Sequence, residues 1–148
     1  MTRQAIPAER IASLRRKMKE SIGWTDEELD RISPKQWIQT DSEYKLRHYK
    51  MIAEVVQING HCELRPKIGD KYVFTNGCML KLEESTFPGV CLWALSGIFP
   101  ISLMVIDRIL AGLDPNEMFR DHAGCMDLSL GIGGLGQVIF KVYCEKAK

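Results

Sequence analysis

Apolar residues in the first fifty positions recur at the spacing of an amphipathic helix. They stand at intervals of three and four residues, at Ile11, Leu14, Met18 and Ile22. This spacing aligns side chains along one stripe of a helix. Pro7 suits the first turn of such a helix and Gly23 suits its end. The pattern therefore predicts a helix over roughly residues 7–22.

Two further helix starts follow this stripe. Thr25 stands three residues before Glu28, the spacing of a capping box in which each side chain bonds the other residue's backbone amide. Ser33 precedes Pro34, so that a capping residue is followed by one that favours the first helical turn. These signals predict two short helices. We therefore expect residues 1–48 to form a helical extension.

From about residue 49 the pattern changes to that of β-strands. Residues 49–58, YKMIAEVVQI, are rich in β-branched side chains and are followed by the turn dipeptide Asn59-Gly60. The alternation in QVIFKVYCE predicts a strand over residues 137–145. Further strands are predicted over residues 71–74, 79–83 and 125–130, the last joined to the C-terminal strand by the glycine-rich residues 131–136.

An uncharged run, residues 85–106, lies between these strands. Its length would permit a transmembrane helix, but its helical part begins only near Val90. That leaves too short a span for a bilayer core of about 30 Å. We therefore expect a buried core helix, bent at Pro100 and ended by Gly112.

Together these elements predict an α+β fold, in which a small antiparallel sheet packs on one long, apolar, proline-bent helix. The helical extension precedes this core at the N-terminus. We place the extension at residues 1–48 and the core domain at residues 49–148. A chain of 148 residues fits one compact core that carries an extension.

Composition excludes classes of function without choosing one. The chain is 45% hydrophobic and 26% charged, which is typical of globular proteins. Its formal net charge of +1 gives no field that would attract nucleic acid or an anionic membrane, so neither is expected as a partner. An odd number of cysteines, five, and a charged N-terminal segment without a secretory pattern favour a cytoplasmic location.

Histidine and cysteine side chains are the candidate ligands of a metal site. The candidates are His61, Cys62, Cys91, His122 and Cys125. Imidazole nitrogen and thiolate sulfur are the ligand types of zinc sites and iron–sulfur clusters, which makes these two the candidate cofactors. The chain has no Cys-x-x-Cys pair, however, and a free cysteine also serves as a small buried hydrophobic residue. Both interpretations stay open.

Cys91 is also a candidate catalytic nucleophile. It stands where the long apolar helix is predicted to begin, and the helix dipole lowers the pKa of a thiol at that position. Either His61 or His122 is a candidate general base for it. Burial in the apolar run would oppose this role, because burial raises a thiol pKa.

Several short motifs of the core occur in a characteristic order. They are G-H-C at residues 60–62, K-I-G-D at 67–70, P-G-V-C at 88–91, G-C-M-D at 124–127 and a closing F-K-V strand. This order resembles a family of small, uncharacterised bacterial and archaeal proteins that are found often in anaerobes. The resemblance covers about residues 49–145. Residues 1–48 are not part of the family's usual pattern.

The resemblance implies that three cysteines matter more than the other two. The family's recurring cysteines correspond to Cys62, Cys91 and Cys125, and not to Cys78 or Cys144. It also implies a role in anaerobic metabolism. The chain departs from the pattern at Met126, where the family usually has proline, and at residues 64–66, which replace a charged loop.

Three hypotheses of function follow. The first is a binding or accessory module that associates with its own copy or with a partner subunit through residues 1–48. The second is a metal or iron–sulfur protein using Cys62, Cys91 and Cys125, with His61 or His122 as a fourth ligand. The third is an enzyme acting on a small molecule through a cysteine or His122.

Overall fold

The computed structural model describes residues 6–147, which form two compact units divided between Tyr44 and Lys45. The first unit contains three helices, α1 (Ala8–Ile22), α2 (Asp26–Asp30) and α3 (Pro34–Ser42). A short 3₁₀ helix, η1 (Glu43–His48), spans the boundary between the units.

The helices of the first unit begin and end at the signals that the sequence contains. Gly23 ends α1 in a left-handed conformation, with φ of 81°. Thr25 and Glu28 form the predicted capping box of α2. Ser33 caps α3 in the same way, and its partner in that capping box is Gln36. The predicted helices are therefore confirmed.

The apolar side chains of the first unit pack on one another. Leu14, Leu29 and Trp37, one from each helix, form a buried cluster of their own. Ile11 and Met18 lie half-buried against it. The apolar stripe of α1 is thus covered largely within its own unit.

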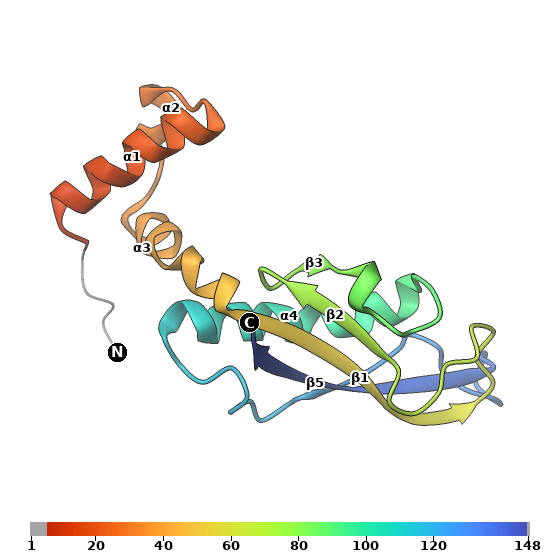
Figure 1. Ribbon diagram of the computed structural model, residues 1–148. Coiled ribbons are helices and arrows are strands. Elements are labelled where there is room, and N and C mark those ends of the chain that lie inside the picture. The colour runs from red at the N-terminus through yellow and green to blue at the C-terminus, as the bar shows by residue number, and fades with distance from the viewer. Residues whose placement is uncertain (1–5, 148) are drawn as a thin grey trace. The chain divides into compact units, whose positions relative to one another are not determined.

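The second unit is an antiparallel sheet with one long helix packed on it, so the predicted α+β class is confirmed (Figure 1). The strand order is β3-β2-β1-β5-β4. The bounds are β1 (Tyr49–Gly60), β2 (Lys71–Thr75), β3 (Met79–Leu80), β4 (His122–Gly124) and β5 (Gly136–Lys146).

The two longest strands, β1 and β5, form the centre of the sheet. Their register runs from Tyr49 opposite Lys146 to Gly60 opposite Gly136, with a bulge between Val55 and Gln57. Alternation along the strands turns one set of side chains toward the helix. That set includes Met51, Ala53 and Val55 of β1 and Val138, Phe140 and Val142 of β5.

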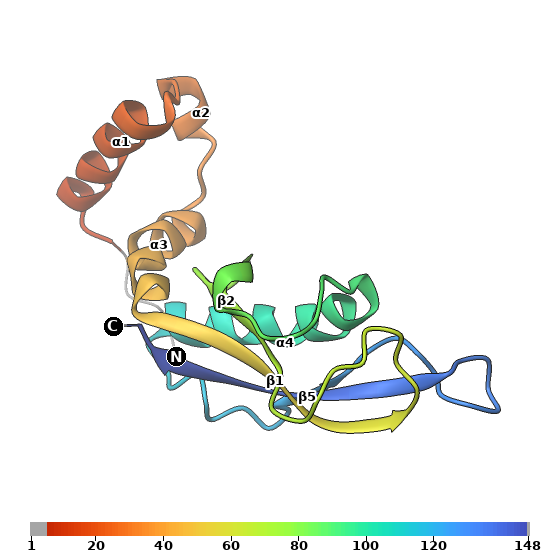
Figure 2. The same cartoon turned by 45° about the vertical axis from the view of Figure 1, so that its right-hand side comes forward.

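Helix α4 (Leu92–Ala111) covers one face of this sheet, and Figure 2 shows the two layers. Its buried positions face the sheet, at Ala94, Ile98, Ile101, Ser102, Val105 and Ile109. Pro100 lies inside the helix, and Gly112 ends it in a left-handed conformation, as predicted. The helix approaches the sheet edge so closely at Gly97 that a Cβ on this residue would lie 2.0 Å from the carbonyl oxygen of Gly124.

Two predicted strands differ from the structure. The segment 79–83 is a strand only at Met79–Leu80, because Leu82–Glu84 forms the 3₁₀ helix η2. The predicted strand over 125–130 is wrong, since β4 ends at Gly124. The side chain of Asp127 accepts hydrogen bonds from the backbone amides of Ser129 and Leu135, both at 3.0 Å, and so folds this segment into a compact loop.

Candidate functional site

The three cysteines singled out by the sequence lie around the N-terminal end of α4. Cys91 is the residue that precedes the first turn of α4. Cys62 follows the end of β1, and Cys125 follows β4. All three are half-buried and pack against the main hydrophobic cluster. Folding therefore brings these distant segments to the same end of the core domain.

Tyr72 organises this end of the molecule. Its buried hydroxyl donates a hydrogen bond to the carbonyl oxygen of Gly89, at 2.7 Å, and accepts one from the amide of Cys91, at 3.1 Å. Its ring stacks on Phe87 with the centroids 4.5 Å apart. Burial raises the pKa of Tyr72 to about 12, and the nearby thiols of Cys91 and Cys62 add to this. The phenol thus stays neutral and fixes the turn that leads into α4.

Cys125 is tied into the sheet beside β5. Its amide donates to the carbonyl oxygen of Val138, at 2.9 Å, and its sulfur accepts a hydrogen bond from the amide of Val138, at 3.3 Å. These paired contacts hold the thiol at the edge of the main cluster. Its surroundings are therefore those of a packed side chain.

The two candidate histidines are more exposed than these three cysteines. His61 is half exposed, with Nε2 3.4 Å from a carboxylate oxygen of Glu63. His122 precedes Cys125 by three residues in an extended segment, and positions three apart in a strand point to opposite faces. His122 is accordingly exposed while Cys125 packs on the core side. The H-x-x-C spacing therefore does not bring imidazole and thiol together.

Within residues 6–147, no group of three or more His, Cys, Asp or Glu side chains has the arrangement of a metal site. The zinc and iron–sulfur hypothesis, on Cys62, Cys91 and Cys125 with His61 or His122, has no assembled ligand set to support it in that part of the chain. It stays a prediction.

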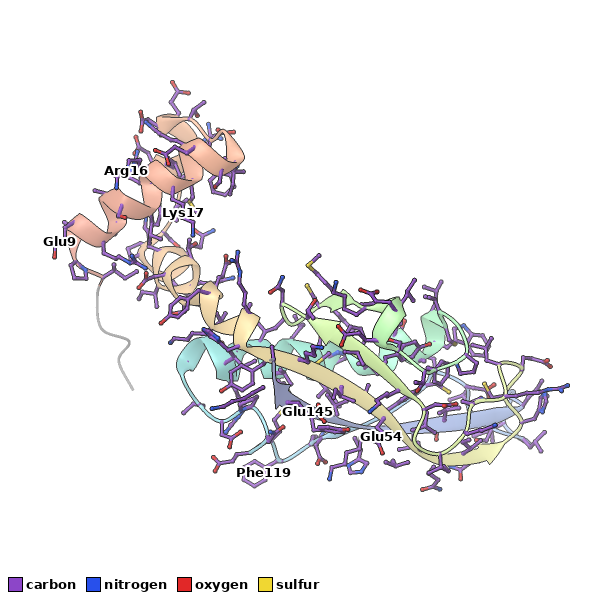
Figure 3. The ribbon with its side chains drawn as sticks, in the orientation of Figure 1. Glu9, Arg16, Lys17, Glu54, Phe119 and Glu145 are labelled. Carbon is purple, nitrogen blue, oxygen red and sulfur yellow. The ribbon has the colours of Figure 1, made fainter. Side chains whose placement is uncertain are left out.

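A polar cleft of about 470 Å³ lies over β1 and β5, where Glu54, Lys141 and Tyr143 belong to the sheet face turned away from α4. Its lining residues are Glu54, Asn116, Asp121, Lys141, Val142 and Tyr143. Glu54 stands directly across from Lys141 in the register of β1 and β5. Figure 3 marks Glu54 on β1. The cleft thus collects groups of both charges from neighbouring strands.

Two hydrogen-bonded pairs border this cleft. The Tyr143 hydroxyl donates to Glu54 Oε2 at 2.7 Å. Burial, with the Glu54 carboxylate beside it, raises the pKa of Tyr143 to about 12. Nδ1 of His122 lies 2.7 Å from Oδ1 of Asp121, and the imidazole lowers the pKa of that carboxyl group. The Asp121 carboxylate therefore orients the imidazole through Nδ1.

Of these residues the sequence analysis singled out only His122. Lys141 and Tyr143 share a face by alternation in the predicted C-terminal strand, which was an available signal. Glu54 joins them only through the register of β1 against β5. That register depends on tertiary pairing and is not encoded in local spacing.

A group of large apolar side chains is exposed on the outer face of α4. Large side chains there remain 39% to 73% exposed: Leu92, Trp93, Phe99, Leu103 and Met104. By length and composition α4 could cross a membrane, and a third of its most apolar window is buried in the fold. One such helix is weak evidence of a span, because the core helix of a folded domain, which is mostly buried, passes the same test. The predicted core helix is buried on the side that faces the sheet and exposed on the other.

A second cleft, of about 550 Å³, lies at the C-terminal end of this face. Its apolar lining comes from Leu103, Met104, Met118 and Phe119, and its charged lining from Asp107, Arg108, Glu117 and Arg120. Phe119 is fully exposed and projects from the loop after α4 (Figure 3). The apolar face therefore continues from the helix onto this loop.

Comparison of the chain with protein-family models, with curated proteins and with solved structures finds no match.

Proposed function

We propose that this protein is a binding module whose working surface is the outer face of α4. The observation that carries the proposal is the exposure of Leu92, Trp93, Phe99, Leu103 and Met104 on one helix. Single exposed apolar residues are ordinary, but a contiguous group of large ones marks an interaction surface. The helix buries its other side against the sheet, so the exposed side is available for a partner.

The chemistry of this face resembles the centre of a protein interface. No charged residue occurs between Leu92 and Ile106. Interface centres are depleted in charge and enriched in aromatic residues and methionine. Trp93, Phe99 and Met104 supply those residue types. Charged groups appear only beyond this stretch, beginning with Asp107.

The proposal moves the expected contact from the helical extension to the core domain. The predicted association through residues 1–48 relied on an apolar stripe that needed covering. Leu14 of that stripe is buried with Leu29 and Trp37 inside the first unit. Association through the extension stays a prediction, with Ile22 as the most exposed residue of the stripe.

Site-specific photo-crosslinking tests the proposal. A photoreactive phenylalanine analogue replaces Phe99 in one variant and Leu103 in another, in the full chain expressed in cells. The matched control carries the same analogue at Glu145, an exposed position on β5. We expect adducts of defined mass from the two α4 positions and not from the control. Adduct yields at α4 no higher than at Glu145 would contradict the proposal.

The polar cleft supports a second candidate, an enzyme or receptor for a small molecule. The observation that favours it is the His122–Asp121 pair beside a cleft that also presents Lys141 and the Tyr143–Glu54 pair. A carboxylate-oriented imidazole is a common acid–base group. A fragment screen by NMR, with His122→Gln and the control His61→Gln, tests this. Binding that shifts residues of the cleft and is lost only in His122→Gln supports it.

A further inference from the structure

We infer that the occupant of the outer face of α4 is a second copy of this chain, packed antiparallel about a two-fold axis that passes between Phe99 and Pro100. The inference rests on the proposed function, because it assigns a partner to the same face. The observation behind it is the spacing of the exposed positions along α4.

The exposed positions of α4 include a set with palindromic spacing. These are Leu92, Ser96, Phe99, Pro100, Leu103 and Asp107, separated by four, three, one, three and four residues. At 3.6 residues per turn they lie within an arc of about 100° on one side of the helix. A two-fold axis between Phe99 and Pro100 therefore maps this stripe onto itself. An isologous interface requires that property.

The two-fold axis also pairs side chains of complementary size. It places Ser96 of one copy opposite Leu103 of the other, and Phe99 opposite Pro100. A small residue facing a large one allows two helices to approach to about 8–10 Å. The same pairs occur twice in the interface, once on each side of the axis.

The ends of the two helices are electrostatically complementary in this arrangement. Asp107 of one copy comes opposite Leu92, in the first turn of the other copy's α4. Cys91, which precedes that turn, makes no side-chain capping bond. The first amides of a helix carry partial positive charge, which a nearby carboxylate stabilises.

Trp93 lies beside the stripe. In this arrangement it contacts the partner near the cleft at the C-terminal end of the partner's α4. The axis places Trp93 opposite Ile106, next to Met104 and Asp107, which line the cleft of about 550 Å³. Tryptophan is one of the residue types enriched among the side chains that dominate the binding energy of protein interfaces. Each copy would thus insert one indole at the C-terminal end of the other copy's helix.

The exposed apolar area reaches the size of a small protein interface, and the charge pattern differs from that of a helix that binds anionic lipid. Leu92, Trp93, Phe99, Leu103 and Met104 are 39% to 73% exposed, so together they supply roughly 500 Å² of apolar surface per copy and ~1,000 Å² per pair. That is the lower limit for a specific interface. A helix that binds anionic lipid carries lysine and arginine along its polar edges. The stretch from Leu92 to Ile106 has neither.

A charge-exchange experiment on the full chain tests the register. The variants are Leu103→Glu, Ser96→Lys and the double variant of both, measured by light scattering and sedimentation. We expect a dimer for the unaltered chain and at least about tenfold weaker association for Leu103→Glu, because two carboxylates enter an apolar interface. The double variant should recover association, since the introduced ammonium group of one copy then faces the introduced carboxylate of the other.

Control measurements separate the alternatives. Val56→Glu places the same charge at an exposed apolar position on β1 and should leave the dimer unchanged. Circular dichroism and thermal unfolding confirm that each variant folds. A monomeric unaltered chain, a dimer that Leu103→Glu leaves intact, or a double variant without recovery would overturn the inference. Two further outcomes would overturn it: adducts at Phe99 with a different protein, and vesicle binding by the monomer. Adducts with a different protein would still support the binding-module proposal.

Discussion

Tyr72 contributes to the fold through two backbone contacts as well as through its ring. Its hydroxyl is the partner of the Gly89 carbonyl and of the Cys91 amide, which belong to the turn that enters α4. Buried backbone groups that lose their partner cost free energy close to that of a lost hydrogen bond. A single oxygen atom thus positions the start of the longest helix.

Tyr72→Phe should therefore lower the free energy of unfolding by about 1–3 kcal/mol. The phenylalanine keeps the stacking on Phe87 but leaves the two backbone groups without the hydroxyl. Urea denaturation measures the difference. Tyr143→Phe is the matched control, and it should cost less because the hydroxyl of Tyr143 bonds one side-chain carboxylate, that of the partly exposed Glu54, and no backbone group. Equal losses in the two variants would show that the Tyr72 hydroxyl has no special structural role.

The five cysteines should differ in reactivity according to their burial. Cys144 is buried in β5, and this burial, with Asp114 as a smaller cause, raises the pKa of its thiol to about 12. Cys78 is exposed. At pH 8 we expect iodoacetamide to modify Cys78 and to leave Cys144 unmodified until the protein is denatured, because the thiolate is the reactive form. Peptide mass spectrometry reads both sites, and modification of native Cys144 would contradict the prediction.

At the scale of elements, local signals located the helices and the long strands well. Capping residues such as Thr25 and Ser33 act within one turn, so their effect is visible in the sequence. The ends of β1 and β5 were predicted to within about two residues. The path of the chain after β4 was not predicted. It depends on the carboxylate of Asp127, which accepts a hydrogen bond from an amide as far along the chain as Leu135.

The candidate site was predictable only in part, for a related reason. Cys91 directly precedes α4, where the sequence analysis expected the helix to begin. The cleft beside the His122–Asp121 pair depends instead on the register that sets Glu54 opposite Lys141. The close contact of Gly97 with Gly124 also depends on tertiary structure, because the local sequence around a helical glycine does not indicate which residue it contacts.

The loop between β4 and β5 should stabilise the protein in a pH-dependent way. The amide of Ser129, followed by those of Leu135 and Gly136, lowers the pKa of Asp127 below its ordinary value of about 4. A carboxyl group with a lowered pKa in the folded state stabilises the protein above its unfolded pKa, and this contribution is lost as the pH falls through the folded pKa.

Asp127→Asn should accordingly be less stable than the unaltered chain at pH 7, and the difference should shrink as the pH falls below about 4. Urea midpoints measured at pH 7 and pH 3 provide the test. Asp70→Asn is a comparison in another turn, where Asp70 Oδ2 accepts from the amide of Lys67 at 2.7 Å. A difference at Asp127 that stays constant with pH would rule out the carboxylate as its source.

At the scale of the whole molecule, the described residues contain two separate hydrophobic clusters. One consists of residues of the first unit, centred on Leu14, Leu29 and Trp37. The other joins α4 to the sheet and includes Val55, Val105 and Phe140. Cooperative unfolding follows from shared buried contacts, so clusters that share no buried residue are expected to unfold as separate units.

Truncating one cluster should therefore leave the other protected. Leu29→Ala is expected to destabilise its own unit by about 2–5 kcal/mol, and Val55→Ala should destabilise the core domain through the same loss of packing. Hydrogen exchange read by mass spectrometry follows both units in one sample. Leu29→Ala should raise exchange in α1–α3 and not in β1 or β5, and Val55→Ala should do the reverse. Ile22→Ala, at an exposed position, should change neither unit appreciably. If either core substitution raised exchange equally in both units, the two clusters would be one cooperative system, and the binding face on α4 would then depend on the helical extension for its stability.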